Sequence, residues 1–120
     1  MVAGCVQLVR RQGVDAALIM ALGGPAAGKF LDGRPHPDRY WLRVWGLRGL
    51  LWAWDESAAP AVQAALADES WRVREMAAKV VAKRSIGEAM SAVAQLREDP
   101  VPRVRAATER AVRLLSQARA

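Results

Sequence analysis

One phrase of eleven residues occurs twice in this chain, and the two copies align without a gap. Residues 68–78 read Asp-Glu-Ser-Trp-Arg-Val-Arg-Glu-Met-Ala-Ala, and residues 99–109 read Asp-Pro-Val-Pro-Arg-Val-Arg-Ala-Ala-Thr-Glu. The second copy begins 31 residues after the first, since 99 − 68 equals 31. A period of about 20 to 50 residues is typical of a solenoid, in which each unit buries its apolar side only against its neighbours. We therefore expect an extended α-helical scaffold.

The residues around each copy have the pattern of an amphipathic α-helix. In both 71–84 and 102–116, apolar residues recur every three or four positions and charged residues share another side. This spacing is typical of a helix with one buried face. Asp68 and Asp99 stand just ahead of these helices, where a carboxylate can accept hydrogen bonds from free N–H groups. Each long helix is therefore predicted to follow a turn that carries an aspartate.

Shorter apolar patterns precede the long helices and predict helical hairpins. Residues 60–67 and 86–96 each place their apolar residues on one side, so the order short helix, turn, long helix occurs twice. A third, degenerate copy lies upstream, with a long helix at about 38–54 and a companion at 14–22. Residues 2–11 predict one more helix, which we expect to cover the open end of the stack.

The degenerate copy aligns Arg43 and Val44 with Arg72 and Val73, at an offset of 29. On this alignment the chain is a single all-α domain, a short right-handed α-solenoid (an α-α superhelix) of about three helical hairpins plus an N-terminal capping helix. The predicted division assigns residues 1–13 to the cap, 14–55 to a degenerate first repeat, 56–84 to the second repeat and 85–120 to the third.

Composition limits the class of protein. Apolar residues make up 52% of the 120 residues, which excludes a disordered chain. No apolar stretch approaches the ~20 residues of a membrane span, so no membrane partner is expected. Cys5 is the only cysteine, so no disulfide can form within the chain, and a cytoplasmic location is expected. The formal net charge of +6 suits an acidic protein surface or a phosphate backbone as partner.

The paired phrases resemble HEAT repeats, and their period is similar to that of the short HEAT repeats in phycobilisome lyase-like proteins. The family pattern carries an Asp in the turn between its two helices and an Arg six positions later. Asp68 with Arg74, and Asp99 with Arg105, match this spacing. The resemblance implies that these four residues form a structural ladder of charged hydrogen bonds between consecutive repeats. In the degenerate copy Trp45 stands where the Arg is expected. Bilin lyase activity is not implied, because the match brings no catalytic residue with it.

No group of residues predicts a catalytic, cofactor or metal site. Residues 23–29 satisfy most of the phosphate-loop pattern, but Phe30 stands where Ser or Thr must ligate magnesium, and the rest of the chain reads as helix. His36 has no second His nearby, and Cys5 has no activating base beside it. We therefore expect a linker of Gly and Pro, a solvated His, a buried thiol and no enzymatic activity.

Basic residues of the long helices line up across the repeats. Arg43, Arg72 and Arg103 are equivalent on the alignment above, and so are Lys79 and Arg110. The second helices of a solenoid line its concave surface, so these five residues predict a positive stripe that contacts a partner there. The alternative is an ordinary solvated helix face.

Tryptophans gather in the degenerate copy. Trp41, Trp45 and Trp52 fall on one stripe of the predicted helix. In one interpretation the N-terminal residues and the next repeat cover this stripe as core. In the other, tryptophans such as Trp41 and Trp45 stay exposed and bind a partner or a second copy of the chain, because Trp and Arg dominate binding hot spots.

These features favour a non-enzymatic helical-repeat scaffold that binds another protein, an acidic one if the positive stripe makes the contact. The alternative is a module that binds the phosphate backbone of nucleic acid. A relative of the HEAT-like DNA glycosylases is a third interpretation, because Trp52 and Asp55 resemble the Trp and Asp residues on their basic concave face. A homodimer through the Trp-rich first repeat is the fourth. The sequence does not identify the partner.

Overall fold

The structure is a computed structural model that describes residues 1–12, 16–32 and 36–119, and all regular structure in these ranges is helical. The α-helices are α1 (Val2–Val9), α2 (Ala16–Gly23), α3 (Tyr40–Gly49), α4 (Ala59–Ala65), α5 (Trp71–Arg84), α6 (Met90–Gln95) and α7 (Pro102–Arg119). The 3₁₀ helices are η1 (Pro25–Leu31), η2 (Glu56–Ala58), η3 (Gly87–Ala89) and η4 (Leu96–Glu98).

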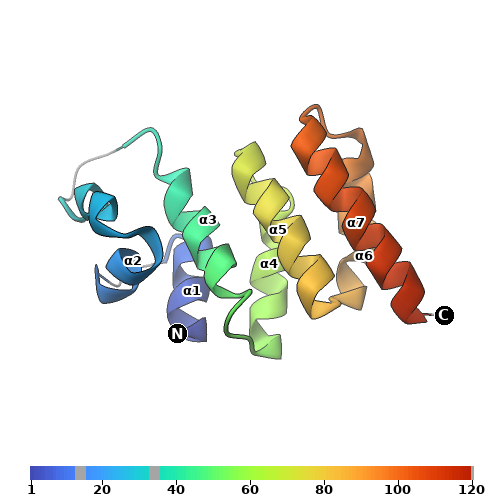
Figure 1. Ribbon diagram of the computed structural model, residues 1–120, viewed down its shortest axis with the longest axis horizontal. Helices are drawn as coiled ribbons and strands as arrows, with labels where there is room; N and C mark the ends of the chain where they lie inside the picture. Colours follow the sequence, from blue (N-terminus) through green and yellow to red (C-terminus); the bar gives the residue numbers. More distant parts are fainter. Residues whose placement is uncertain (13–15, 33–35, 120) are drawn as a thin grey trace.

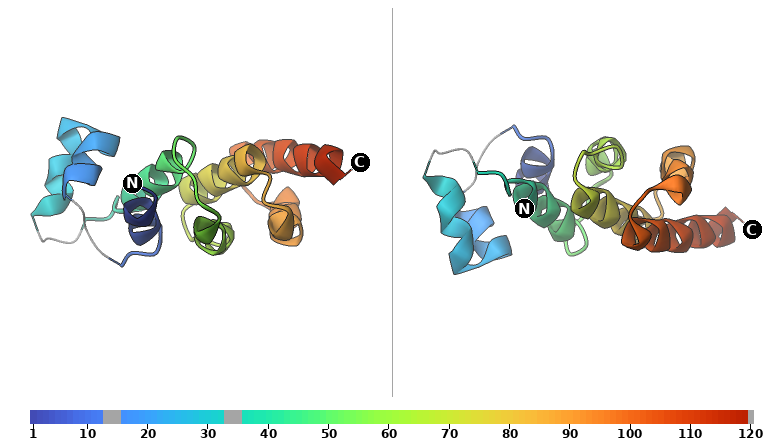
Figure 2. Two further views of the ribbon diagram at one scale, coloured as in Figure 1. Left: turned by 90° about the horizontal axis from the view of Figure 1, so that it is seen from below. Right: turned by 90° about the horizontal axis from the view of Figure 1, so that it is seen from above.

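The helices form two layers that run along the molecule. α3, α5 and α7 lie side by side in one layer, and α1, α4 and α6 lie in the other, so that α1 pairs with α3, α4 with α5 and α6 with α7 (Figure 1, Figure 2). The molecule measures 47 × 30 × 20 Å. The predicted short α-solenoid is confirmed, because the hairpins follow one another in a row and do not gather around a common centre.

The N-terminal helices exchange the roles that the sequence predicted. The predicted companion of the helix at 38–54 was 14–22, and the predicted cap was 2–11. In the structure α1 packs along α3, and α2 with η1 covers the outer side of α3 at the end of the row (Figure 1). Residues 13–15, which include the predicted start of the companion helix, lie outside the described residues.

Two glycines of α3 explain why α1 is its companion. A Cβ at Gly46 would lie 2.7 Å from the backbone oxygen of Cys5, and a Cβ at Gly49 would lie 2.5 Å from Cys5 Sγ. Any side chain at either position would push α1 away, so glycine is the residue that permits this close approach. The predicted offset of 29 aligns Gly49 with Ala78, and this comparison gives no sign of the contact with Cys5.

The buried faces of the long helices follow the predicted pattern. Val73 and Val80 of α5 and Val104 and Ala111 of α7 are fully buried. Buried apolar side chains form one cluster that extends from α1 to α7. Each hairpin is therefore stabilised by its neighbours, as the repeat period predicts.

Candidate functional site

An arginine–aspartate ladder links the three hairpins in the turns before the long helices. Arg74 Nε donates to Asp99 Oδ2 at 2.7 Å, and one repeat earlier Arg43 Nε donates to Asp68 Oδ2 at 2.8 Å. Each aspartate also receives a bond on its backbone oxygen, from Arg74 Nη1 to Asp68 at 2.8 Å and from Arg105 Nη1 to Asp99 at 2.6 Å. The ladder holds one repeat against the next and orients the long helices that carry the surface residues.

The pKa of both ladder aspartates lies below its usual range. Burial raises the pKa of Asp99, but hydrogen bonds from Arg74 and from the Val101 backbone N–H lower it by more, so the pKa of Asp99 lies below its usual range. Burial likewise raises the pKa of Asp68, and the hydrogen bond from Arg43 is the first of the contacts that bring it below its usual range. These carboxylates are structural, because their charge is satisfied within the chain.

Arg43 belongs to this ladder and not to the positive surface stripe on which the sequence placed it. Only 7% of Arg43 is exposed. Arg43 precedes Arg74 by 31 residues, which is the spacing between the other two repeats. The first hairpin therefore keeps the 31-residue period, and the predicted offset of 29 is wrong. Trp45 therefore does not replace the ladder arginine, and the residue that corresponds to Arg72 in the first hairpin is Trp41.

The surface positions next to the ladder form a stack of arginines and aromatic rings. The Arg72 guanidinium carbon lies 4.5 Å from the ring centroid of Trp71, 5.5 Å from that of Tyr40 and 5.5 Å from that of Trp41. The guanidinium carbon of Arg103, on α7, lies 5.3 Å from the centroid of the same Trp71 ring. We call these five residues the Arg–aromatic stripe. It crosses from the first hairpin to the third, and cation–π contacts hold its two arginines in place.

Aromatic contacts continue from the stripe into the end of the molecule. Trp41 and Trp45 are stacked with ring centroids 6.3 Å apart, and Trp45 meets the edge of Phe30 at 5.7 Å. Trp41 and Trp45 are both half-buried, whereas Trp52 is 82% exposed. The predicted tryptophan stripe is thus divided, since its first two rings pack within the molecule and its last ring faces solvent.

The remaining basic residues of the predicted stripe differ in how far they are neutralised. Arg103 Nε donates to Glu75 Oε2 at 3.0 Å, and Lys79 Nζ lies 3.9 Å from the same oxygen. Arg110 is exposed, and Arg72 is partly exposed. Within the described part of the chain, no carboxylate contacts Arg72 or Arg110.

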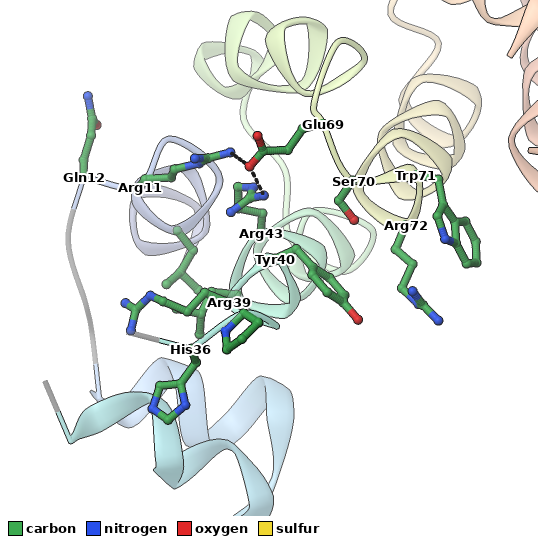
Figure 3. A pocket seen from close by; sticks show the side chains of 13 residues that line it. Arg11, Gln12, His36, Arg39, Tyr40, Arg43, Glu69, Ser70, Trp71 and Arg72 are labelled. Atoms are coloured by element: carbon green, nitrogen blue, oxygen red, sulfur yellow. Dashed lines mark hydrogen bonds and ion pairs between the residues drawn. The ribbon is translucent and has the colours of Figure 1, made fainter. Parts of the chain in front are cut away.

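A cavity of about 740 Å³ lies beside the stripe, where α1 ends and α3 and α5 begin (Figure 3). Its charged side chains are Arg11, Arg39, Arg43, Arg72 and Glu69, and the rings of Tyr40 and Trp71 form part of its wall. The cavity is therefore strongly positive, with aromatic surface on one side. The sequence did not predict it, because its residues come from three helices and from the segments beside them, which are distant along the chain.

Lys29 and His36, which the sequence does not assign to a site, have partners in the structure. Lys29 Nζ lies 2.5 Å from Asp38 Oδ2, on the segment that carries the incomplete phosphate-loop pattern. His36 Nε2 lies 3.0 Å from Asp32 Oδ1. Among the described residues, no three His, Cys, Asp or Glu side chains gather where they could hold a metal ion. None of the helices that the structure describes has the length and apolar character that a membrane crossing requires.

Residues 58–83, which span α4 and almost all of α5, match the family model of the HEAT repeat. The comparison with curated proteins gave no match, and the comparison with solved structures gave none either. The matched residues contain Asp68 and Arg74 of the ladder. The resemblance inferred from the paired phrases is therefore confirmed for the HEAT repeat, and the finer likeness to the short phycobilisome lyase-like repeats stays a prediction.

Proposed function

We propose that this HEAT repeat protein is a non-enzymatic scaffold that binds an acidic segment of another protein along the face of α3, α5 and α7. Stacked helical repeats offer extended surfaces for such partners. The observation that carries the proposal is the environment of Arg72, whose guanidinium lies against three rings and contacts no carboxylate in the described part of the chain. Because Cys5 is a buried thiol, a reducing cytoplasm is the compartment we propose.

The ring contacts prepare Arg72 for a carboxylate from outside the chain. A guanidinium that packs against rings keeps N–H donors at its edge, and these donors fit the two oxygens of a carboxylate. Because the rings already restrict the Arg72 side chain, binding costs less conformational entropy than it does at a free surface arginine. Arg and Trp are also the residue types that most often dominate protein–protein binding energy.

Arg103 and Arg110 extend this surface onto α7, and Lys79 extends it along α5. Arg103 is 67% exposed, although it also donates to Glu75. A partner with several acidic residues would therefore meet a row of basic groups across the second and third hairpins. Such charge complementarity raises the association rate and selects against basic partners.

Two alternatives are supported by single observations. The net charge of +6 suits the phosphate backbone of nucleic acid, to which binding weakens steeply with salt. The exposure of Trp52 suits a homodimer through the first hairpin. Sedimentation at several concentrations tests the dimer, because a monomer at every concentration removes it.

Charge reversal tests the proposal. The probe is a short fluorescein-labelled peptide that is rich in Glu with interspersed Leu, and binding is measured by fluorescence anisotropy. We expect Arg72→Glu and Arg103→Glu each to weaken binding by about tenfold or more, because each removes a favourable charge and adds a repulsive one. Arg113→Glu is the matched control, since Arg113 is exposed on α7 and contacts no ring or carboxylate among the described residues.

A DNA duplex of random sequence forms the second arm of the experiment. Tighter binding of the duplex than of the peptide, with a steep loss of affinity as salt rises, would favour the nucleic-acid alternative. Equal effects of all three charge reversals would mean that only net charge matters. Either result overturns the proposed site on the Arg–aromatic stripe, and so does the absence of peptide binding.

A further inference from the structure

We infer that the cavity at the ends of α1, α3 and α5 is the pocket in which an acidic side chain of the protein partner docks, and that Glu69 is a built-in competitor for it. This inference rests on the proposed function and deepens it, because it names where the partner's anchoring residue binds. The cavity shares Tyr40, Trp71 and Arg72 with the stripe and adds the charges of Arg11, Arg39 and Glu69.

The cavity has more positive charge than its own carboxylates balance. Four arginines and one glutamate line it. Arg43 at its base is already bound to Asp68 through two hydrogen bonds, at 2.8 and 3.2 Å. Within the described residues no carboxylate contacts Arg39 or Arg72, so these two guanidinium groups are available to a ligand. The chemistry of the site therefore favours an anion.

The contacts of Glu69 show which arginines a carboxylate can bind in this site. The Oε1 atom of Glu69 lies 3.3 Å from Arg11 Nη2 and 3.7 Å from Arg43 Nη2, so one carboxylate spans a guanidinium group of α3 and one from the segment after α1 (Figure 3). The Glu69 side chain is 77% exposed. An exposed ion pair of this kind is weak, so the carboxylate of a partner can displace Glu69 at small cost.

The walls of the cavity indicate which chemical group of the ligand lies next to its carboxylate. Tyr40 and Trp71 contribute ring surface, and the volume of about 740 Å³ falls in the range of pockets that enclose a ligand with many atoms. A single carboxylate would leave most of that space to water. The occupant that fits both the charge and the rings is a peptide segment in which an acidic residue neighbours an apolar one.

The test uses the labelled Glu- and Leu-containing peptide with full-length protein, together with a twin peptide that carries Gln in place of Glu. We expect Glu69→Gln to tighten binding of the acidic peptide about fivefold, because it removes the competing charge and leaves Arg11 with its longer contact to Asp68, at 3.7 Å. We expect Arg39→Ala to weaken binding by a similar factor. Glu88→Gln is the matched control for the charge change, because Glu88 is exposed on η3 in the third hairpin.

A second measurement locates the peptide. The chain has five tryptophans, whose indole N–H groups give separate signals in a ¹H–¹⁵N spectrum. The Trp71 signal should shift on addition of the acidic peptide, and the Trp52 signal should not, because Trp52 lies past the opposite end of α3. Inorganic phosphate at the same concentration should compete poorly, since it cannot use the ring surface.

The outcomes separate this inference from the proposed function. Peptide binding that depends on Arg72 and Arg103 but not on Arg39 or Glu69 would overturn the cavity as the docking pocket and leave the scaffold proposal standing. Equal binding of the Gln twin, or competition by phosphate as strong as by peptide, would also overturn it. No binding of the acidic peptide would overturn both.

Discussion

Arg43 Nε lies 2.8 Å from Asp68 Oδ2, and this pair repeats, 31 residues later, as the pair of Arg74 with Asp99. The arginine belongs to one long helix, and the aspartate precedes the next. Because both partners are largely buried, the contact fixes the distance and angle between neighbouring hairpins. The surface residues beside it, among them Arg72, are positioned by that same contact.

Loss of Arg43 should therefore destabilise the protein far more than loss of Arg72. Removing one partner of a buried ion pair leaves the other charge unpaired, so we expect Arg43→Ala to lower the free energy of unfolding by about 3 kcal/mol. Arg72→Ala removes cation–π contacts at a partly exposed position and should cost about 1 kcal/mol or less. Urea unfolding followed by circular dichroism measures both. Equal losses in the two variants would contradict the assignment of Arg43 to the ladder.

The ladder aspartates should make stability depend on pH in the acidic range. The pKa of Asp99 is lowered in the folded state by Arg74 and by the Val101 N–H, which outweigh burial. Its contribution is therefore complete above the unfolded-state pKa of about 3.9 and is lost as pH falls through the lower folded-state pKa. The Asp99→Asn variant should be less stable than the wild type at neutral pH. Its free energy of unfolding should also fall less than that of the wild type on acidification.

The measurement is the urea midpoint of the wild type and of Asp99→Asn, from about pH 6 down to about pH 2. Asp55→Asn is a useful comparison, because Asp55 is exposed and its side chain, within the described part of the chain, accepts a turn hydrogen bond from Ser57 and no bond from an arginine. If the curve for Asp99→Asn ran parallel to that of the wild type, the ladder carboxylate would not be the source of the pH dependence.

The effects of substitutions at Gly49 and Cys5 on the free energy of unfolding should be strongly coupled. A Cβ at Gly49 would lie 2.5 Å from Cys5 Sγ, so we expect Gly49→Ala to destabilise the protein by about 1 to 3 kcal/mol through displacement of α1. Cys5→Ala removes the sulfur, and the double variant should be more stable than the sum of the two single changes predicts. Gly87→Ala is the control, because no atom of the described residues lies within 4 Å of its Cβ position. Additive effects would contradict the contact.

Thr108 offers a stabilising substitution. Its hydroxyl is fully buried on α7 and has no hydrogen-bond partner among the residues that the structure describes. A buried polar group without a partner costs about 1 to 3 kcal/mol, so Thr108→Val, which keeps the shape of the side chain, should raise the free energy of unfolding by about 1 kcal/mol. Thermal unfolding measures the change. A lower melting temperature for Thr108→Val than for the wild type would mean that the hydroxyl does bond within the folded chain.

The candidate site was only partly predictable, and particular residues show why. Arg72 and Arg103 lie at the surface positions that the helix periodicity indicates. Arg43 was assigned to that surface because the alignment used an offset of 29, whereas extension of the 31-residue period upstream would have paired it with Arg74. The same extension pairs Trp41 with Arg72. The rings of Tyr40 and Trp71 gave no such signal, because their distances to Arg72 depend on how the hairpins pack.

The sequence by itself determined the repeat, the long helices and their buried faces, because a helix face follows from the local spacing of apolar residues such as Val73 and Val80. Only the tertiary structure decided which helix accompanies α3. Several apolar segments could fill that place, and the choice of α1 depends on the close approach of Cys5 to Gly46 and Gly49, which are distant in sequence. The cavity and the Arg–aromatic stripe arise from the same packing, so they too depend on contacts that no local pattern contains.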